Sequence, residues 1–598
     1  MTARGDSSAV SPGRPGAMID ASAEVPSPAT PAVADGPAAG AAPAGPAAPG
    51  RSPAHAPARA PARTARGDRR SRTTGRGVAS SAQHEGSDDG QWGVLGWRLA
   101  MACLAVVVAV GVVLRFYTHA NLWLDEALTV DISRLPLHDI PGALRRDGAP
   151  PLFYVLLHFW MQVFGTSDLA VRSLSGVVSC LTLPLVWVAA RRLGGRTAAV
   201  AATVLVASSP FAVYYGTEAR MYALVGFLVA AGVVAVQRAL ERPRPGNVVA
   251  VGVCTAALLY SHYWALYLVA ATGLWLLWTA WRGPETTRRA ARLLVGSVVV
   301  GGLAFVPWLP TFVYQARHTG TPWAVPADFA GMVNAISSFA GGATNQGRAL
   351  GLLYFALAGL GFFGLARSRF TVELDLRGRP RSRALGWSFL ATVVLAIIGG
   401  YISKSAFQAR YAMVVFVPLM LLVALGFTTF ADRRVRAVLL AASVVFGLVS
   451  SVPNIQNTRT QAGQVAAVLA RLGRPGDVVA FCPDQLGPDV NRLLPPGRYQ
   501  EITFPRDTGP AFVNWVDYGA AVRGASPVAF ANRVLQMAAP GHQIWLVWQG
   551  GYKDFGTRCQ QIETHLLADR QLGAHEMFAP SSRYYEPMEL VHFVHLTG

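Results

Sequence analysis

Long apolar segments recur along most of this chain, and they constrain its fold more than any other feature. The segments run for about 14–22 residues with few charges, and most are long enough to cross the hydrocarbon core of a bilayer. The sequence therefore predicts a polytopic α-helical membrane protein with about eleven transmembrane helices. The predicted spans lie near residues 97–115, 169–190, 196–213, 220–238, 247–260, 263–281, 291–308, 349–366, 385–402, 409–430 and 435–452.

Composition excludes a single soluble core, because 52% of the 598 residues are hydrophobic and only 14% are charged. The net charge of +19 raises the question of a nucleic-acid partner. The arginines, however, form short clusters between apolar segments and do not lie along one amphipathic face. Membrane topology explains such clusters, so we expect no nucleic acid among the partners.

The basic clusters fall in alternate connections between the predicted spans, which the positive-inside rule makes cytoplasmic. They are Arg191 to Arg196, Arg238 to Arg244, Arg282 to Arg292, Arg367 to Arg383 and Arg433 to Arg436. An odd number of spans then places the N-terminus in the cytoplasm and the chain after residue 453 outside the plasma membrane. We expect a multi-pass plasma-membrane protein in which residues 116–168 form the first extracytoplasmic connection.

Three regions follow from these patterns. Residues 1–94, rich in Ala, Pro and Arg, cannot bury enough apolar surface and are expected to be a disordered cytoplasmic tail. Residues 95–452 form the transmembrane domain, and apolar spacing at 129–144 and 151–164 predicts two helices lying on its outer face. Residues 453–598 alternate between helical and strand patterns, which is typical of a small α/β domain. Its expected helices are 462–472, 527–538 and 555–568, and its expected strands are 478–481, 499–504, 543–548 and 589–595.

Two adjacent carboxylates, Asp125 and Glu126, follow the first predicted span. Burying a carboxylate costs several kcal/mol unless it finds partners, and no basic residue lies close by in sequence. The pair therefore predicts a functional site at the outer membrane face.

Other polar side chains converge on the same face in this topology. A transferase acting on a lipid-linked sugar phosphate needs a carboxylate to take the acceptor's proton, which suits Asp125, and cations to hold the leaving phosphate. For each residue a structural role stays open, such as snorkelling at a helix end for the arginines or a satisfied interfacial histidine. The candidate substrate-binding residues are Asp147, Arg172, Tyr215, Glu218, Arg220, His262, Lys404, Arg410 and Tyr411.

Cys482 and Cys559 both lie in the domain that the topology places outside the membrane. Two thiols in an oxidising compartment favour a disulfide, with two separate buried cysteines as the alternative.

The order of short motifs resembles a known family. Asn121 to Ala127 contains Leu-x-x-Asp-Glu-like residues, Asp147 leads an Asp-x-x-Pro-Pro-Leu-x-Tyr element, and Arg172 stands in Ala-x-Arg. A Tyr-x-x-Glu-Ala-Arg-Met-Tyr-Ala-Leu element follows at 215–224. Together these are similar to the GT-C glycosyltransferases, in particular the family-39-like group of protein O-mannosyltransferases and lipid A aminoarabinose transferases. The likeness covers about 95–430 and is clearest at 121–225.

The resemblance implies a GT-C fold and transfer of a sugar, with inversion, from a polyprenyl-phosphate donor to an extracytoplasmic acceptor such as a glycan, a lipid or a protein. It implies Asp125 as the catalytic carboxylate, Glu126 as its structural neighbour or a metal contact, and Arg172 as a phosphate or acceptor contact. Family members differ in their use of a divalent cation, and Asp125 and Glu126 would be its ligands here. Where the family often has His or Lys before the two prolines, this chain has Gly148-Ala149, which directs attention to Lys404.

Two other classes of function compete with this reading. A transporter or flippase for a lipid-linked glycan predicts charges near mid-span and a repeat between halves, and neither is found in the sequence. The other alternative is a non-catalytic scaffold for envelope assembly, and the Asp125-Glu126 pair argues against it because a scaffold does not require two carboxylates at the membrane boundary.

Overall fold

The computed structural model describes residues 89–319, 329–342, 344–369, 371–403, 408–538 and 541–596. Most of the predicted tail, residues 1–94, therefore lies outside the described residues. The described chain from Cys103 onward belongs to one compact unit, and the preceding part of the first helix belongs to a second.

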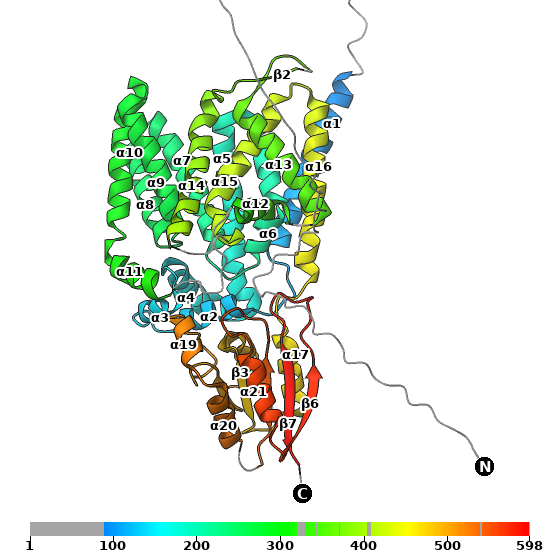
Figure 1. Ribbon diagram of the computed structural model, residues 1–598. Coiled ribbons are helices and arrows are strands. Elements are labelled where there is room, and N and C mark those ends of the chain that lie inside the picture. Colours follow the sequence, from blue (N-terminus) through cyan, green and yellow to red (C-terminus); the bar gives the residue numbers. More distant parts are fainter. Residues whose placement is uncertain are drawn as a thin grey trace, which may run out of the picture. The chain divides into compact units, whose positions relative to one another are not determined.

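Every predicted span overlaps a helix, and several of these helices run side by side (Figure 1). Within the part of the chain that the structure describes, seven helices are long and apolar enough to cross a membrane by length and composition. The prediction of a polytopic helical membrane protein is confirmed. The helices that overlap the predicted spans, a larger set than these seven, are α1 (Asp89–Leu114), α5 (Asp168–Ala207), α7 (Tyr222–Glu241), α8 (Pro245–Leu259), α9 (Ala265–Arg282), α10 (Glu285–Leu303), α13 (Asn345–Phe363), α14 (Pro380–Ser403), α15 (Met413–Gly426) and α16 (Arg433–Gln456).

Helix α5 contains two predicted spans within one 40-residue element. They are separated where Gly194 and Gly195 leave the helical conformation, with Gly195 at φ 72°. Glycine has no Cβ and adopts this left-handed conformation at low cost, so the chain bends between the spans. The second span continues into α6 (Pro210–Gly216), whose N-cap Ser209 accepts a hydrogen bond from the backbone N–H of Ala212.

Helix α15 forms the centre of the membrane domain. All of its residues are buried, and it packs against α5, α7, α13 and α14. It is apolar along its whole length, and in this fold the neighbouring helices cover it.

The first connection outside the spans holds α2 (Leu124–Arg134), α3 (Ile140–Asp147) and α4 (Leu152–Phe164). The prediction of one helix over 129–144 is wrong, because the chain leaves the helical conformation at Leu135 and continues through Pro136. Proline has no backbone N–H and disfavours a helical conformation at the residue before it. Further short elements are α11 (Leu309–His318), α12 (Phe329–Ser337), the strands β1 (Gly364–Ala366) and β2 (Val372–Leu374), and the 3-10 turns η1 (Val306–Trp308), η2 (Ser338–Ala340), η3 (Ala409–Ala412) and η4 (Phe427–Thr429).

The C-terminal region is an α/β domain, as predicted, built on a five-stranded sheet of order β4-β3-β5-β7-β6. Strand β3 pairs in parallel with β4 and β5, while β7 runs antiparallel to β5 and β6. The strands are β3 (Val478–Cys482), β4 (Gln500–Thr503), β5 (Ile544–Trp548), β6 (Leu572–Phe578) and β7 (Glu589–His595). The helices are α17 (Ala462–Leu472), α18 (Gly487–Leu493), α19 (Tyr518–Gly524), α20 (Pro527–Met537) and α21 (Arg558–Leu567), with the 3-10 turn η5 (Asp484–Leu486).

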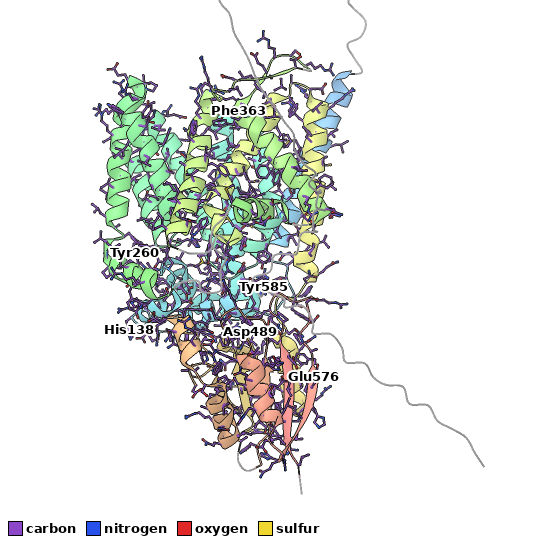
Figure 2. The ribbon with its side chains drawn as sticks, in the orientation of Figure 1. His138, Tyr260, Phe363, Asp489, Glu576 and Tyr585 are labelled. Atoms are coloured by element: carbon purple, nitrogen blue, oxygen red, sulfur yellow. A yellow bond between two sulfur atoms is a disulfide. The ribbon has the colours of Figure 1, made fainter. Side chains whose placement is uncertain are left out.

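Both faces of this sheet carry a hydrophobic core, so β3 is buried along its whole length. Cys482 at the end of β3 and Cys559 on α21 form a disulfide with their Cα atoms 5.4 Å apart. This is the pair expected from the sequence, and it ties one covering helix to the sheet. Figure 2 shows the side chains of this domain, including Asp489 on α18 and Glu576 on β6.

Candidate active site

Helix α2 carries Asp125 and Glu126 in its first turn and is shared by two hydrophobic cores. Leu124 and Leu128, one helical turn apart, pack into the core of the C-terminal domain, whereas Val130 packs into the core of the membrane domain. Helix α18 of the C-terminal domain also packs against α2. The two carboxylates therefore lie on a short helix that is fixed from both sides.

Glu126 is fully buried and is a hydrogen-bond acceptor on both oxygens. Arg172 donates to Oε1 at 2.7 Å and to Oε2 at 2.5 Å, Arg459 lies 3.4 Å from Oε2, and the backbone N–H of Ala219 donates to Oε1 at 2.8 Å. Burial alone would raise the pKa of Glu126, but the charge and hydrogen bonds of Arg172, then Arg459 and Ala219, hold it below its ordinary value. Glu126 is thus a buried structural centre held by two arginines.

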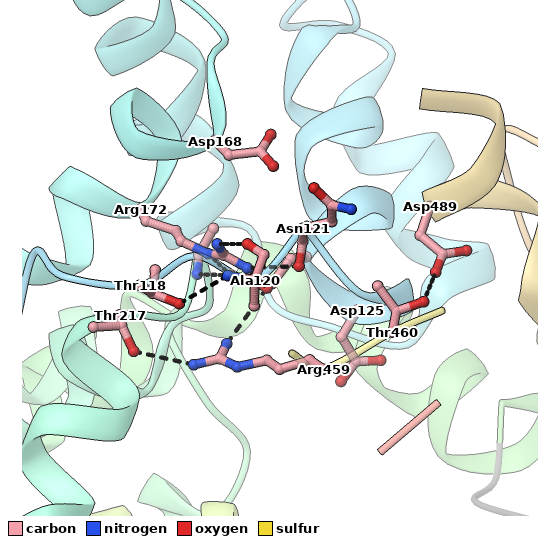
Figure 3. A network of polar contacts seen from close by, with 12 residues as sticks. Thr118, Ala120, Asn121, Asp125, Asp168, Arg172, Thr217, Arg459, Thr460 and Asp489 are labelled. Atoms are coloured by element: carbon pink, nitrogen blue, oxygen red, sulfur yellow. Dashed lines mark hydrogen bonds and ion pairs between the residues drawn. The ribbon is translucent and has the colours of Figure 1, made fainter. Parts of the chain in front are cut away.

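The two arginines extend this centre to further segments (Figure 3). Arg172 also donates to the backbone carbonyls of Ala120 and, at 3.0 Å, Asn121. Arg459 donates to the hydroxyl of Thr217 at 3.0 Å. All three side-chain nitrogens of Arg172 are therefore engaged by the protein, which makes it a positioning residue for α2 in this structure.

Asp125 is held differently, because its carboxylate is partly open. Its Oδ2 lies 3.1 Å from Nη1 of Arg410 and 3.8 Å from Nη2 of Arg220, and 18% of its side chain is exposed. No hydrogen bond from the described residues reaches its Oδ1. Asp125 therefore keeps one oxygen for a ligand while two cations stand beside the other.

Arg220 links Asp125 to Asp147. It donates to the hydroxyl of Thr129 at 2.8 Å and lies 3.2 Å from the hydroxyl of Tyr154, which donates to Oδ2 of Asp147 at 3.0 Å. Burial raises the pKa of Asp147, and Arg220 acts against that rise. Asp147 thereby orients Tyr154 and, through it, Arg220. It is linked to Asp125 only through these two side chains.

Glu218 is a second carboxyl group near Asp125. It is 1% exposed, and among the described residues its Oε2 has no hydrogen-bond partner. Burial raises its pKa to about 7, with Arg459 opposing and Glu126 adding to the rise. A neutral carboxylic acid at this place can donate one hydrogen bond to a bound substrate.

The remaining predicted residues form an aromatic layer. The ring of His262 lies 5.2 Å from that of Tyr411 and 5.8 Å from that of Tyr222, and Tyr222 in turn contacts Tyr215 at 5.0 Å. The backbone N–H of Trp264 donates to Nδ1 of His262, and burial, followed by Arg220 and Arg410, lowers the histidine's pKa to about 3. His262 is therefore neutral, with Nε2 as its donor.

The structure thus brings together Asp125, Arg220, Arg410 and, through Tyr154, Asp147. Lys404, also expected at this site, lies outside the described residues. Arg459 and Tyr154 are site residues that sequence reasoning missed. For Arg459 a signal existed, because it is the arginine between the last span and the first helix of the next domain.

A divalent cation is not favoured by this arrangement of the two carboxylates. Asp125 and Glu126 diverge toward different arginines, and both oxygens of Glu126 are occupied. Within the described ranges, no group of three or more His, Cys, Asp or Glu side chains is placed to hold a metal ion.

An apolar cavity of about 380 Å³ runs between α7, α8, α9 and α14. Leu258 and Leu268 line it beside the connection that carries His262, and the charged residues Arg192, Glu241 and Arg381 also line it. Its lining is mostly apolar, with a few charged side chains among the lining residues.

Comparison with known proteins supports a glycosyltransferase. Residues 148–310 match the family model of dolichyl-phosphate-mannose-protein mannosyltransferase. ArnT from Cupriavidus metallidurans in the apo state superposes with a TM-score of 0.52 at 14% identity, covering 83% of this chain and 98% of ArnT. The same protein bound to undecaprenyl phosphate gives a TM-score of 0.50 with the same identity and coverage. No curated protein sequence matches the chain significantly.

At 14% identity the structural likeness shows the fold and transfers no residue roles. The fold and the family match agree with the motifs quoted from the sequence. The chain resembles the GT-C superfamily of glycosyltransferases and shares their membrane-embedded fold.

Proposed function

We propose that this protein transfers a sugar from a polyprenyl-phosphate-linked donor to an acceptor on the extracytoplasmic face, with inversion at the anomeric carbon. The observation that carries the proposal is the contrast between two adjacent carboxylates. Glu126 is buried and neutralised by two arginines, whereas Asp125 is partly exposed, keeps one oxygen unbonded by the described residues and stands beside two arginines.

The proposed chemistry is a single displacement. The acceptor hydroxyl attacks the anomeric carbon on the face opposite the phosphate, and Asp125 takes the hydroxyl proton as the new bond forms. The bond from the anomeric carbon to the phosphate oxygen breaks, and its electron pair leaves with the phosphate. Arg410 and Arg220 are the cations placed to stabilise that charge, since guanidinium groups bind phosphate through paired hydrogen bonds.

The donor's lipid chain is assigned to the apolar cavity between α7, α8, α9 and α14. Its outer end, at Leu258 and Leu268, adjoins the connection that places His262 near Arg410 and Arg220. A polyprenyl chain in this cavity would set its phosphate beside the two arginines. Undecaprenyl phosphate bound to the similarly folded ArnT supports this class of donor.

The basic connections support placement of the site outside the cell. The basic clusters fall in alternate connections between the predicted spans, which the positive-inside rule makes cytoplasmic, and the cluster around β2 lies at the opposite end of the helices from α2 (Figure 1). We assign the N-terminal tail to the cytoplasm and residues 453–598 to the extracytoplasmic side.

The test uses the purified full-length protein with two candidate donor classes, polyprenyl-phosphoryl sugars and nucleotide sugars. We expect release of polyprenyl phosphate from the first class and no turnover of the second. Movement of a labelled polyprenyl-phosphoryl sugar across a vesicle bilayer without release of polyprenyl phosphate would instead support a flippase and contradict the proposal.

A further inference from the structure

The connection between β6 and β7, residues 579–588, brings the C-terminal domain to the membrane-domain site. It is clamped by Gln461, whose Oε1 accepts hydrogen bonds from the backbone N–H groups of Ser581 and Met588, each at 2.9 Å. The backbone N–H of Glu586 donates to the carbonyl of Arg459 at 2.8 Å. The connection is therefore fixed to residues 459–461, the short segment whose Arg459 pairs with Glu126.

Glu586 fixes the connection to α2 itself. Its Oε2 accepts a hydrogen bond from the backbone N–H of Leu124 at 3.3 Å, at the first residue of α2. The N-cap, Trp123, makes no side-chain hydrogen bond to the helix. The C-terminal domain thus supplies the acceptor that the end of α2 lacks, one residue before Asp125.

Tyr585 places an exposed aromatic ring at this junction (Figure 2). Its ring meets that of Trp123 edge to face, with centroids 5.1 Å apart and an interplanar angle of 87°. Although it is held by this contact, Tyr585 remains 52% exposed. The guanidinium of Arg410, which pairs with Asp125, lies over the ring of Trp123, 5.9 Å from its centroid.

Trp123 supplies a second, independent sign of a ligand. The residue is 5% exposed, yet its Nε1 has no hydrogen-bond acceptor among the described residues. A buried indole N–H without an acceptor costs free energy, and native proteins nearly always satisfy such groups. A ligand oxygen at this place would remove that cost.

We propose that Tyr585 and Trp123 form the acceptor-binding surface, and that the acceptor is a carbohydrate. The inference rests on the proposed transferase function and assigns the acceptor side of its site to the C-terminal domain. The apolar C–H face of a sugar ring packs on the exposed face of Tyr585, and a sugar hydroxyl accepts from Nε1 of Trp123. Arg410, whose guanidinium lies 5.9 Å from the Trp123 ring, also lies 3.1 Å from Oδ2 of Asp125, so a neighbouring hydroxyl of that sugar is directed toward Asp125.

A peptide acceptor fits this surface less well. Extended peptides bind largely through main-chain hydrogen bonds to an open backbone edge. In the 579–588 connection the N–H groups of Ser581, Glu586 and Met588 already donate within the protein. What the connection offers is the ring of Tyr585, which suits a sugar.

The experiment measures initial rates with the full-length protein and a polyprenyl-phosphoryl sugar donor that it turns over. Short mannose and arabinose oligosaccharides serve as probe acceptors, and a Ser/Thr-containing peptide represents the protein class. Tyr585→Ala should raise the KM for an oligosaccharide about 3- to 10-fold, as expected for loss of one aromatic contact. The KM for the donor should change less than the KM for the oligosaccharide, because the ring of Tyr585 is assigned to the acceptor. Tyr585→Phe, which keeps the ring, should keep the KM for the oligosaccharide near the wild-type value.

Tyr584→Ala is the matched control, because Tyr584 adjoins Tyr585 in sequence and its hydroxyl accepts a hydrogen bond from Gln464 on α17. An unchanged oligosaccharide KM in Tyr585→Ala would overturn the inference while donor turnover still supports the transferase. Transfer to the peptide alone, or to none of the oligosaccharides, would overturn the carbohydrate assignment. Absence of donor turnover in the wild type would instead contradict the proposed function itself.

Discussion

Replacing Glu126 by glutamine should destabilise the protein strongly, although the change removes only a charge. Glu126 is 0% exposed, and its partners Arg172 and Arg459 are 4% and 6% exposed, so none of the three groups can turn to water. Removing one member of a buried ion pair costs about 3–5 kcal/mol, because the remaining charges stay buried without compensation. The low pKa of Glu126 means that this stabilisation is complete above its ordinary pKa and is lost only as the pH falls through the lower, folded-state value.

The assay compares thermal unfolding of detergent-purified wild type and Glu126→Gln at pH 7.5 and one scan rate, because membrane proteins often unfold irreversibly. The matched control is Glu241→Gln, which breaks the exposed Arg192–Glu241 pair, with 27% and 61% of the side chains exposed. Exposed pairs contribute about 0–1 kcal/mol, so the control should unfold near the wild-type temperature. Equal unfolding temperatures for Glu126→Gln and Glu241→Gln would refute the structural role given to Glu126.

Three further predictions follow from the same contacts. Burial raises the pKa of Glu218 from 4.5 to about 7, so the stability that comes from its protonated form is complete below pH 4.5 and is lost as the pH rises through 7. The unfolding temperature of the wild type should therefore fall between pH 5 and pH 8, and that of Glu218→Gln should fall less. An equal fall in both proteins would contradict the prediction. Non-reducing peptide mapping should recover Cys482 joined to Cys559, and Cys559→Ser should cost about 4 kcal/mol by loop-closure entropy, unless both thiols are found free. Arg410→Met should weaken binding of a polyprenyl-phosphoryl sugar about 10- to 100-fold, as expected for a lost charged hydrogen bond. Lys404→Met tests the second expected phosphate contact. Unchanged donor affinity in both variants would mean that the phosphate binds at another place.

The membrane fold was predictable because its signal is local. A segment of about 20 apolar residues must form a helix in lipid, where every backbone group needs an internal partner. The break after α2 was also readable, since Pro136 interrupts the apolar spacing that indicated one helix. Strand β6 was missed because it is an edge strand with an exposed middle, where His575 and Glu576 replace the alternation that marks a strand.

The different roles of the two carboxylates were not predictable from the sequence. Asp125 and Glu126 are adjacent, and nothing nearby in the sequence says which one turns toward the buried arginines. The partners of Glu126 lie 46 and 333 residues away, and the cap of α2 lies 462 residues away, so only the folded chain reveals them. Sequence patterns find the carboxylate pair, but tertiary contacts assign its roles.

The single-turnover rate of sugar transfer by Asp125→Asn, measured with saturating polyprenyl-phosphoryl donor, tests whether Asp125 takes the acceptor's proton. The amide keeps the shape of the side chain and loses its basicity, so the rate should fall about 10²–10⁴-fold. The unfolding temperature should stay close to that of the wild type, because Asp125 is partly exposed. An Asp125→Asn protein that transfers sugar near the wild-type rate would contradict the account.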